Sequence, residues 1–222
     1  MRLFRSILNR IIQTDVLSRL AYYPDWRITQ TEADAVSVVC GVLMNIEIHE
    51  VPLEGKPVLK ELMDQYLAEL VPYSEDVLDI HDPLEYRYFD LYWSEPNRLP
   101  LFVLVDGRLA GFALIRTQVE NHIAGGEVRN SIAEFFIIPS FRLQRIGETI
   151  ATQIFNTYPG KWMIAQLAEH NGAQMFWRTI IHRYTQGRYK EVFHNDQHWY
   201  GPVQHFDNTT VTPQSEVMVS DL

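Results

Sequence analysis

The sequence predicts an α/β fold in which strands and helices alternate within one domain, residues 44–206. The spacing of apolar residues changes repeatedly between the period of two typical of strands and the period of 3.6 typical of helices. Glycine and proline stand between most of these segments, where they mark turns and helix ends. The chain of 222 residues is 46% hydrophobic and 21% charged, so it can bury a full core.

The first segments of this domain are a strand and a helix. Apolar and polar residues alternate along Asn45–Val51, which predicts a strand. Pro57 then stands at a favourable first position for a helix. A second, shorter helix is expected within Pro83–Trp93. The apolar face of the first helix is made of Leu59, Leu62, Met63, Tyr66, Leu67 and Leu70.

The middle of the chain predicts a hairpin, a central strand and a helix. Strands are expected at Pro100–Val105 and Leu109–Gln118, because the Asp-Gly pair between them is a strong signal for a tight hairpin. The strand Ser131–Ile138 is apolar enough to lie at the centre of a sheet. A helix is expected from Ile146 to Tyr158, where a Pro-Gly pair ends it.

The last segments are three strands and a helix. A strand is expected at Trp162–Leu167 and a helix at Gly172–Tyr184, which ends near a glycine. Two further strands are expected around Tyr189–Phe193 and Trp199–Gln204. The predicted order is therefore β-α-α-β-β-β-α-β-α-β-β.

Two terminal segments fall outside this pattern. Residues 1–43 contain an amphipathic helix pattern in which Arg2, Arg5 and Arg10 lie outside the apolar stripe. Three interpretations remain: the segment packs on the domain, lies on a membrane surface, or is an appendage to the functional protein. Residues 207–222 are polar and lack a core pattern, which indicates a flexible tail.

Composition excludes several classes of protein. The net charge of −9 argues against a nucleic-acid partner held by bulk charge. The single cysteine, Cys40, excludes an intrachain disulfide and a cysteine-built zinc site. The longest apolar stretch, residues 35–44, is about half the length that a membrane span needs. We therefore expect a cytoplasmic protein without a membrane span, whose oligomeric state the sequence does not determine.

The junction between the central strand and the next helix is the segment most informative about function. The strand Ile132–Ile138 runs into a short turn that carries Arg142 and Gly147, and a helix begins at once. Backbone N–H groups at a helix N-terminus can hold phosphate oxygens, and an arginine adds a charged donor. Most strand–loop–helix junctions bind no phosphate, so an ordinary connection is the alternative.

These residues resemble the acyl-CoA signature of the Gcn5-related N-acetyltransferase (GNAT) superfamily, Q/R-x-x-G-x-G/A. The signature aligns with Arg142–Gly147, and Pro139 fits the usual approach to that loop. The resemblance covers roughly residues 45–204. The stretches DLYW, GFALI, AEFFI, PGKW and FWRTII look like those of a poorly characterised group of predicted bacterial acetyltransferases.

The resemblance implies a mixed, mostly antiparallel sheet of about six to seven strands, splayed at its central strand and flanked by helices. It also implies acetyl-CoA as the acyl-donor substrate and no metal. The residues expected to hold acetyl-CoA are Ile137, Ile138, Arg142, Leu143, Gln144, Arg145, Ile146, Gly147 and Asn171.

Three positions depart from the family pattern. Arg145 replaces the first glycine of the signature, which would let the backbone come closest to the pyrophosphate. Asn171 falls about one residue out of register with the asparagine of the family. Trp177 occupies the position of the tyrosine that protonates the departing thiolate, and an indole is not a useful proton donor.

The reaction implied by the resemblance is direct transfer of the acetyl group to a primary amine within a ternary complex. The acceptor would be a small-molecule amine or an amino group of a protein. A backbone N–H near Ile137 would stabilise the carbonyl oxygen, and Glu134 is the candidate catalytic base, because burial raises the pKa of a carboxylate. The alternative is a structural Glu134, paired with an arginine or with neighbouring backbone. Cys40 lies outside the signature region, so an acyl-cysteine is not expected.

A second hypothesis is a catalytically silent acyl-CoA-binding or interaction module on the same fold, which Arg145 and Trp177 favour. The acids at 75–85 would suit a cationic amine, with a solvated acidic loop as the alternative. His194, His198 and His205 do not predict a metal site, because they straddle a turn between strands. The acids in question are Glu75, Asp76, Asp79, Asp82 and Glu85.

Overall fold

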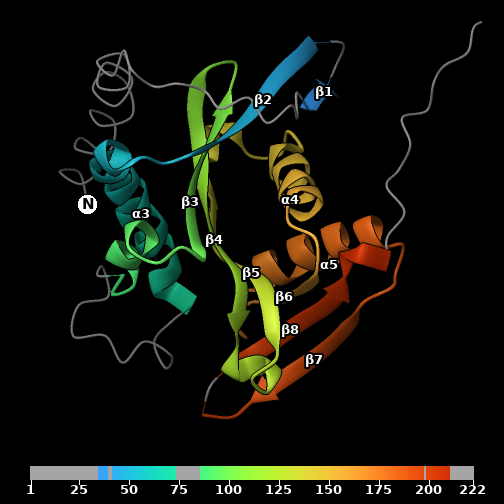
Figure 1. Cartoon of the computed structure of the whole chain (residues 1–222). Helices are drawn as coiled ribbons and strands as arrows, with labels where there is room; N and C mark the ends of the chain where they lie inside the picture. The colour runs from blue at the N-terminus through green and yellow to red at the C-terminus, as the bar shows by residue number, and fades with distance from the viewer. Residues whose placement is uncertain (1–34, 40–41, 74–85, 198, 211–222) are drawn as a thin grey trace, which may run out of the picture.

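One eight-stranded sheet runs through the part of the chain that the computed structural model describes, residues 35–39, 42–73, 86–197 and 199–210 (Figure 1). Its order is β1-β2-β3-β4-β5-β6-β8-β7, and only the pair β5–β6 is parallel. The strands are β1 (Ala35–Val39), β2 (Val42–Glu50), β3 (Arg98–Val105), β4 (Arg108–Glu120), β5 (Val128–Ile137), β6 (Lys161–Ala165), β7 (Lys190–Asn195) and β8 (Tyr200–Asp207).

Within the described ranges, three α-helices and several short 3-10 helices (η) connect these strands. Helix α3 has Pro57 in its first turn, as its sequence predicts, since the fixed φ of proline suits a helix start. The helices used below are α3 (Lys56–Leu70), η2 (Val71–Tyr73), η3 (Phe89–Trp93), η5 (Pro139–Phe141), α4 (Ile146–Thr157) and α5 (Asn171–Thr185).

The predicted α/β class and the mixed, mostly antiparallel sheet are confirmed, and the described sheet has one strand beyond those expected. The additional strand is β1, which pairs with β2, and β2 begins at Val42 rather than at Asn45. Ala35–Val39 is short and β-branched, and the sequence interpretation assigned it to the N-terminal extension. The amphipathic pattern before it and the tail after Thr210 lie outside the described residues.

The second predicted helix is a single 3-10 turn where it is described. Residues 83–85 of the expected range lie outside the described residues, and η3 covers Phe89–Trp93. Its rings are held by local contacts: Phe89 and Trp93 pack edge to face with centroids 5.2 Å apart, and the Arg98 guanidinium lies 5.5 Å from the Tyr92 ring.

The predicted hairpin between β3 and β4 turns through two residues with positive φ. Asp106 has φ 50° and Gly107 has φ 69°, the combination that a tight hairpin turn with the twist of the strands requires. The Asp-Gly pair therefore sets the pairing next to the turn, Val105 with Arg108 and Leu104 with Leu109, before a bulge shifts the register.

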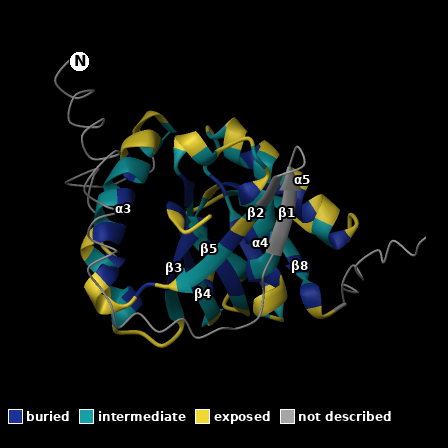
Figure 2. Ribbon diagram, turned by 90° about the horizontal axis from the view of Figure 1, so that it is seen from above, coloured by how far each residue is buried: buried dark blue, intermediate teal, exposed yellow. Residues whose placement is uncertain are grey.

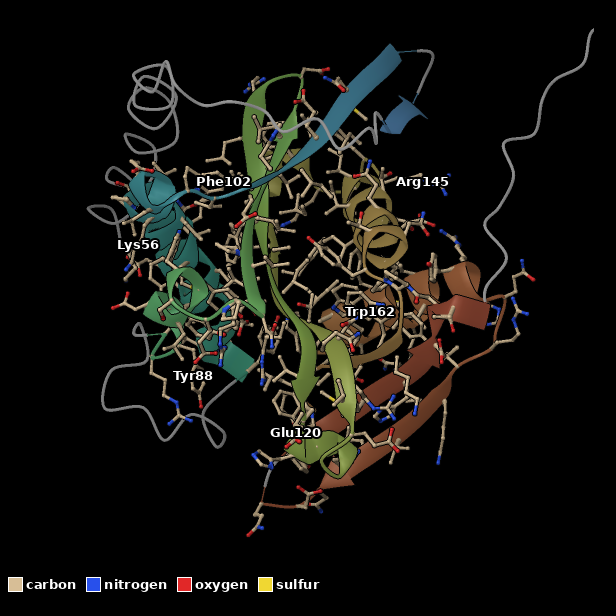
Figure 3. The ribbon with its side chains drawn as sticks, viewed as in Figure 1. Lys56, Tyr88, Phe102, Glu120, Arg145 and Trp162 are labelled. Carbon is tan, nitrogen blue, oxygen red and sulfur yellow. The ribbon has the colours of Figure 1, made fainter. Side chains whose placement is uncertain are left out.

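The helices cover both faces of the sheet and divide the core into two parts (Figures 1 and 2). Helices α4 and α5 bury one cluster, in which Phe155 and Trp162 are fully covered. Helix α3 and η3 bury the other cluster, in which Met63 and Phe102 are fully covered. In Figure 3, Arg145 lies beside α4 and Tyr88 lies on the opposite side of the sheet, beside α3.

The central pair of strands separates soon after it begins. Strands β5 and β6 are paired only at Asn130–Trp162 and Ser131–Met163. From Ile132 onward, β5 keeps its partner β4 on one edge and has no strand partner among the described residues on the other. This is the splay that the resemblance implies, at the predicted strand.

A bulge in β5 decides which face of the sheet its side chains reach. Leu114 pairs with Glu134 and Ile115 pairs with Ile132, so Ala133 is an extra residue on β5. Ile132 therefore lies in the cluster under α4 and α5, whereas Glu134, two residues later, faces α3. Without the bulge the two side chains would share a face.

No helix in the described ranges is both long enough and apolar enough to cross a membrane.

Candidate functional site

The loop between β5 and α4 holds its backbone in an alternating conformation. Leu143 and Arg145 both have φ 62°, in the left-handed region, and Arg145 is the residue directly before α4. Successive N–H groups in such a conformation converge on one side and form a concave site for an anion. The same loop contains the predicted signature, so the sequence motif and the backbone shape coincide.

The hydrogen bonding of the described residues leaves the backbone N–H groups of this loop available to a ligand. Among the described residues, none of the backbone N–H groups of Leu143–Gly147 donates a hydrogen bond. The first intrahelical bond runs from the N–H of Thr149 to the carbonyl of Arg145. The loop therefore presents several donors at the positive end of the α4 dipole, and we call Leu143–Gly147 the N–H cradle.

The left-handed conformation explains why glycine is usual at position 145 of the signature. A residue with a Cβ pays about 1–2 kcal/mol for this conformation, and Arg145 has one. Its side chain is exposed and forms an ion pair with Glu148 at 3.3 Å, which at a surface contributes little. The departure from the family pattern thus costs stability and leaves the cradle intact.

Arg145→Gly is expected to raise the free energy of unfolding by about 0.5–1 kcal/mol, because relief of the left-handed strain exceeds the added entropy of the unfolded chain. Urea denaturation measures the change. Arg145→Ala is the matched control, since it removes the same ion pair and keeps the Cβ. A glycine variant no more stable than the alanine variant would contradict the strain.

Gly147 lies where the cradle meets α5. A Cβ at this position would lie 3.0 Å from two ring carbons of Phe176 and 3.5 Å from Phe135. The close packing of α4 on α5 and β5 therefore leaves little room for a side chain at position 147, which explains why the residue is a glycine. Any larger side chain must displace a ring or point out through the cradle.

Some backbone groups of β5 point away from β4, toward the edge that has no strand partner in the described residues. The N–H of Ile138 donates to the carbonyl of Ala110 at 2.8 Å, and bonding alternates along an antiparallel pair. The backbone groups of Phe135 and Ile137 therefore face the side where β6 diverges. Ile138 does not share this position, because its carbonyl also accepts a bond, from Phe141.

Arg142, the predicted charged donor for phosphate, is engaged elsewhere. Its Nε donates to the carbonyl of Ile137 at 2.7 Å, and its guanidinium pairs with both carboxylate oxygens of Glu69 at 2.8 and 3.1 Å. The guanidinium thus joins the cradle loop to α3 and covers one carbonyl of the open β5 edge. Two side chains of the cradle itself are also placed: Leu143 is fully exposed, and Gln144 donates to the carbonyl of Ser140.

Glu134 lies on the α3 face of β5 among aromatic residues. The hydroxyl of Tyr66 donates to its Oε2 at 2.6 Å, and Tyr86 donates a second hydrogen bond to the carboxylate. The rings of Phe112 and Phe136 pack within 6 Å of the Tyr66 ring. Among the described residues no arginine pairs with this carboxylate, so the structure does not support the alternative of a Glu134–arginine ion pair.

Burial raises the pKa of Glu134 to about 7, although the hydrogen bonds from Tyr66 and Tyr86 oppose the rise. Burial and the charge of Glu134 raise the pKa of Tyr66 well above its ordinary value and that of Tyr92 to about 12. The tyrosines therefore remain neutral donors near pH 7, while about half of the Glu134 carboxyl groups are ionised. A carboxyl group in this state can both take and return a proton at that pH.

The raised pKa of Glu134 predicts a pH-dependent cost of stability. Because the folded-state pKa exceeds the ordinary value of 4.5, stability is highest below that value and falls as pH rises through 7. Glu134→Gln removes this loss. Its advantage over the natural chain should grow by up to about 3 kcal/mol between about pH 5 and pH 8 in urea denaturation. Parallel pH curves for the two proteins would contradict it.

Comparison with known proteins identifies the fold. No protein-family model and no curated protein matches the sequence. Among solved structures, an acetyltransferase from Thermus thermophilus superposes on 73% of this chain and 96% of its own, with 10% identity and a TM-score of 0.52. A GNAT-family acetyltransferase from Streptococcus agalactiae covers 72% and 93%, with 13% identity and a TM-score of 0.53. The chain has the GNAT fold.

An uncharacterised protein from Bacillus halodurans has the same fold, with 75% of this chain and 86% of its own covered, 11% identity and a TM-score of 0.54. Identities of this size establish the arrangement of the elements. The chemistry must come from the residues of this chain.

Trp177, at the position of the tyrosine in the GNAT pattern, is a core residue. Its side chain is 7% exposed, and its ring meets those of Phe135 and Phe176 at centroid distances of 5.3 and 5.1 Å. The indole thus packs behind the open edge of β5. Asn171 is the first residue of α5, exposed, with its N–H bonded to the carbonyl of Glu169 at 3.1 Å.

A stacked pair joins the two sides of the molecule near the start of α5. Tyr73, at the end of η2, stacks on His170 with ring centroids 4.1 Å apart. The Nδ1 of His170 accepts the N–H of Ala173 at 3.2 Å and so caps α5. Together with the Arg142–Glu69 pair, this contact connects α3 and η2 to the loops that follow β5 and β6.

Sequence reasoning missed the partners of Glu134. The sequence places Tyr66 on the apolar face of its helix and Tyr86 within the expected helix Pro83–Trp93, and it predicts no role for either hydroxyl. The available signal is that Tyr66 stands among leucines on a buried helix face while Glu134 stands in an apolar strand. A buried tyrosine hydroxyl needs a hydrogen-bond partner, and a buried acid can provide one. Phe135 was also missed, because the side that its backbone faces depends on register.

No group of three or more His, Cys, Asp or Glu side chains in the described ranges could hold a metal ion. His194 bonds to Asp196 at 3.2 Å, and His198 lies outside the described residues. The acids at 75–85 and Cys40 also lie outside them.

Proposed function

We propose that this protein is a cytoplasmic, acetyl-CoA-dependent N-acetyltransferase that acts on a primary amine. The observation that carries the proposal is the N–H cradle, Leu143–Gly147, at the start of α4 beside the unpaired edge of β5. The unpartnered donors suit the pyrophosphate of coenzyme A, and the open strand edge suits an extended chain with amide groups.

Acetyl-CoA, when bound, supplies a thioester carbonyl that an amine can attack. The backbone N–H of Phe135 or Ile137 would donate to the carbonyl oxygen as it gains charge. Of the two, the N–H of Phe135 lies nearer to the proposed base, because Phe135 directly follows Glu134 on β5. The cradle and the strand edge would hold the acyl donor, so that the attack occurs between bound partners.

Glu134 is the proposed base. Its ionised carboxyl would take a proton from the ammonium form of the acceptor, and the new C–N bond forms as the C–S bond breaks. The thiolate leaves with the electron pair of that bond and takes the second proton from the nitrogen, which gives the amide and free thiol. Its ordinary pKa near 8.5 makes it an acceptable leaving group without a tyrosine acid. The buried Trp177 takes no part in proton transfer.

The direct test has two steps. Acetyl-CoA at millimolar concentration should raise the melting temperature of the full chain, and a panel of amines should then release free thiol in a colorimetric assay. An unchanged melting temperature would contradict the cradle. Binding without thiol release from any amine would support the second candidate, a silent acyl-CoA-binding module, which the core position of Trp177 favours.

A further inference from the structure

Glu134 is held from a helix that lies far from it in sequence. Tyr66 on α3 and Glu134 on β5 are 68 positions apart, and their side chains meet at 2.6 Å. The Tyr66 ring is edge-on to Phe112 at 5.8 Å and tilted against Phe136 at 5.9 Å, both measured between centroids. Contacts from β4 and β5 therefore fix where the hydroxyl points.

We propose that Tyr66 is a positioning residue of the acceptor site, whose hydroxyl orients the Glu134 carboxylate toward the amine. This inference rests on the proposed function, in which Glu134 is the base. Tyr66 does not itself exchange a proton with the acceptor. Its role is to occupy Oε2, so that the carboxylate cannot rotate freely within the aromatic surroundings.

The groups that face Glu134 come from each element packed around it. Tyr66 faces it from α3, Tyr86 from the turn before η3, and Tyr92 from η3. From β4 and β5 the neighbours are apolar: Leu114 pairs with Glu134 across the two strands, and Phe136 lies two residues further along β5 in the same cluster.

Two cations lie behind these neighbours in the described part of the chain. The Arg98 guanidinium lies 5.5 Å from the Tyr92 ring and is paired with Glu95 at 2.6 Å. The Arg142 guanidinium lies 5.3 Å from the Phe136 ring and is paired with Glu69. The carboxylate is thus stabilised by neutral hydroxyls.

Because Tyr66 is a neutral donor, its hydrogen bond has a measurable effect on the pKa of Glu134. Burial raises the pKa of Glu134, and the hydrogen bond from Tyr66 opposes that rise more than the bond from Tyr86 does. Because the pKa of Tyr66 is itself well above the ordinary value, its hydroxyl stays protonated wherever Glu134 titrates. Removing the hydroxyl should therefore raise the pKa of Glu134.

The experiment compares Tyr66→Phe with Tyr184→Phe in the full chain. Both variants keep the ring and lose one hydroxyl, and the Tyr184 hydroxyl bonds instead to Asn156, between α5 and α4. The Glu134 pKa is read by NMR of carboxyl-¹³C-labelled glutamate without acetyl-CoA or amine, with the signal assigned by its absence from Glu134→Gln.

Tyr66→Phe is expected to raise this pKa by about one unit, the shift expected for one hydrogen bond to a charged group. The acidic limb of the pH profile of kcat/KM should move upward by the same amount, so activity falls about tenfold near pH 6 and recovers near pH 9. Tyr184→Phe should move neither the Glu134 pKa nor the acidic limb of the kcat/KM profile. Tyr86→Phe, as a second variant, should move the pKa and the acidic limb upward.

An unchanged NMR titration in a folded Tyr66→Phe protein would overturn the inference. A purely structural role for Tyr66 predicts lower stability with an unmoved pKa and pH profile. The titration needs no substrate, so it separates this inference from the proposed function. A shifted pKa with no thiol release from any amine would retain the Tyr66–Glu134 coupling and count against the acetyltransferase.

Discussion

Replacing Gly147 by glutamate is expected to lower the affinity for acetyl-CoA at least 100-fold. Phe176 lies 3.0 Å from the site of a Cβ, so the added side chain can enter the space behind the glycine only by displacing that ring. We expect it to turn instead toward the N–H cradle, where its carboxylate would take the donors proposed for the pyrophosphate and repel the phosphates. Both effects lower the affinity for acetyl-CoA and not the stability of the protein, because a carboxylate near a helix N-terminus stabilises the helix.

Gly147→Gln is the matched control, with the same size and no charge. Isothermal titration with acetyl-CoA should give the natural chain the highest affinity, the glutamine variant a lower one, and the glutamate variant none that is measurable. Circular dichroism would verify that α4 and α5 remain folded. Equal affinities of the glutamate and glutamine variants would show that no anion is held at the cradle.

The elements that the sequence predicts well are those with a strong local signal. The hairpin turn and the helix start at Ile146 agree with the structure, because an Asp-Gly pair and a period of 3.6 act over a few residues. The signature loop was also found from sequence alone. Its positive φ values at Leu143 and Arg145 could not be, since neither residue type suggests them.

What the sequence does not predict depends on register and on contacts between distant segments. The bulge at Ala133 adds one residue to β5 and moves Glu134 to the α3 face, a shift that no alternation pattern reveals. The ion pair of Arg142 with Glu69, 73 positions away on another element, likewise has no local sequence signal, and the expected contact of Arg142 with phosphate stays a prediction. Strand β1 was missed because five residues are too few for a clear period.

Replacing Glu134 by glutamine is expected to reduce turnover at least 100-fold at pH 7 and leave acetyl-CoA binding intact. An alkylamine with a pKa near 10.4 is only about 0.04% neutral at pH 7, so direct transfer depends on removal of a proton. A positioned base typically contributes 10²–10⁴-fold. Glutamine keeps the shape and can still accept the hydrogen bond from Tyr66, so the loss reports the missing base.

The pH dependence of this deficit distinguishes a base from a structural carboxylate. Below pH 7 the natural enzyme gains ionised Glu134 and the variant gains neutral amine at the same rate, so the ratio of their activities stays level. Above pH 7 the base is fully ionised while neutral amine keeps increasing. The ratio should therefore shrink by up to about tenfold per pH unit until the amine itself titrates. A loss below fivefold at pH 7, or a ratio that is constant with pH, would assign Glu134 to holding α3 against β5 through Tyr66, with the amine deprotonated by another group.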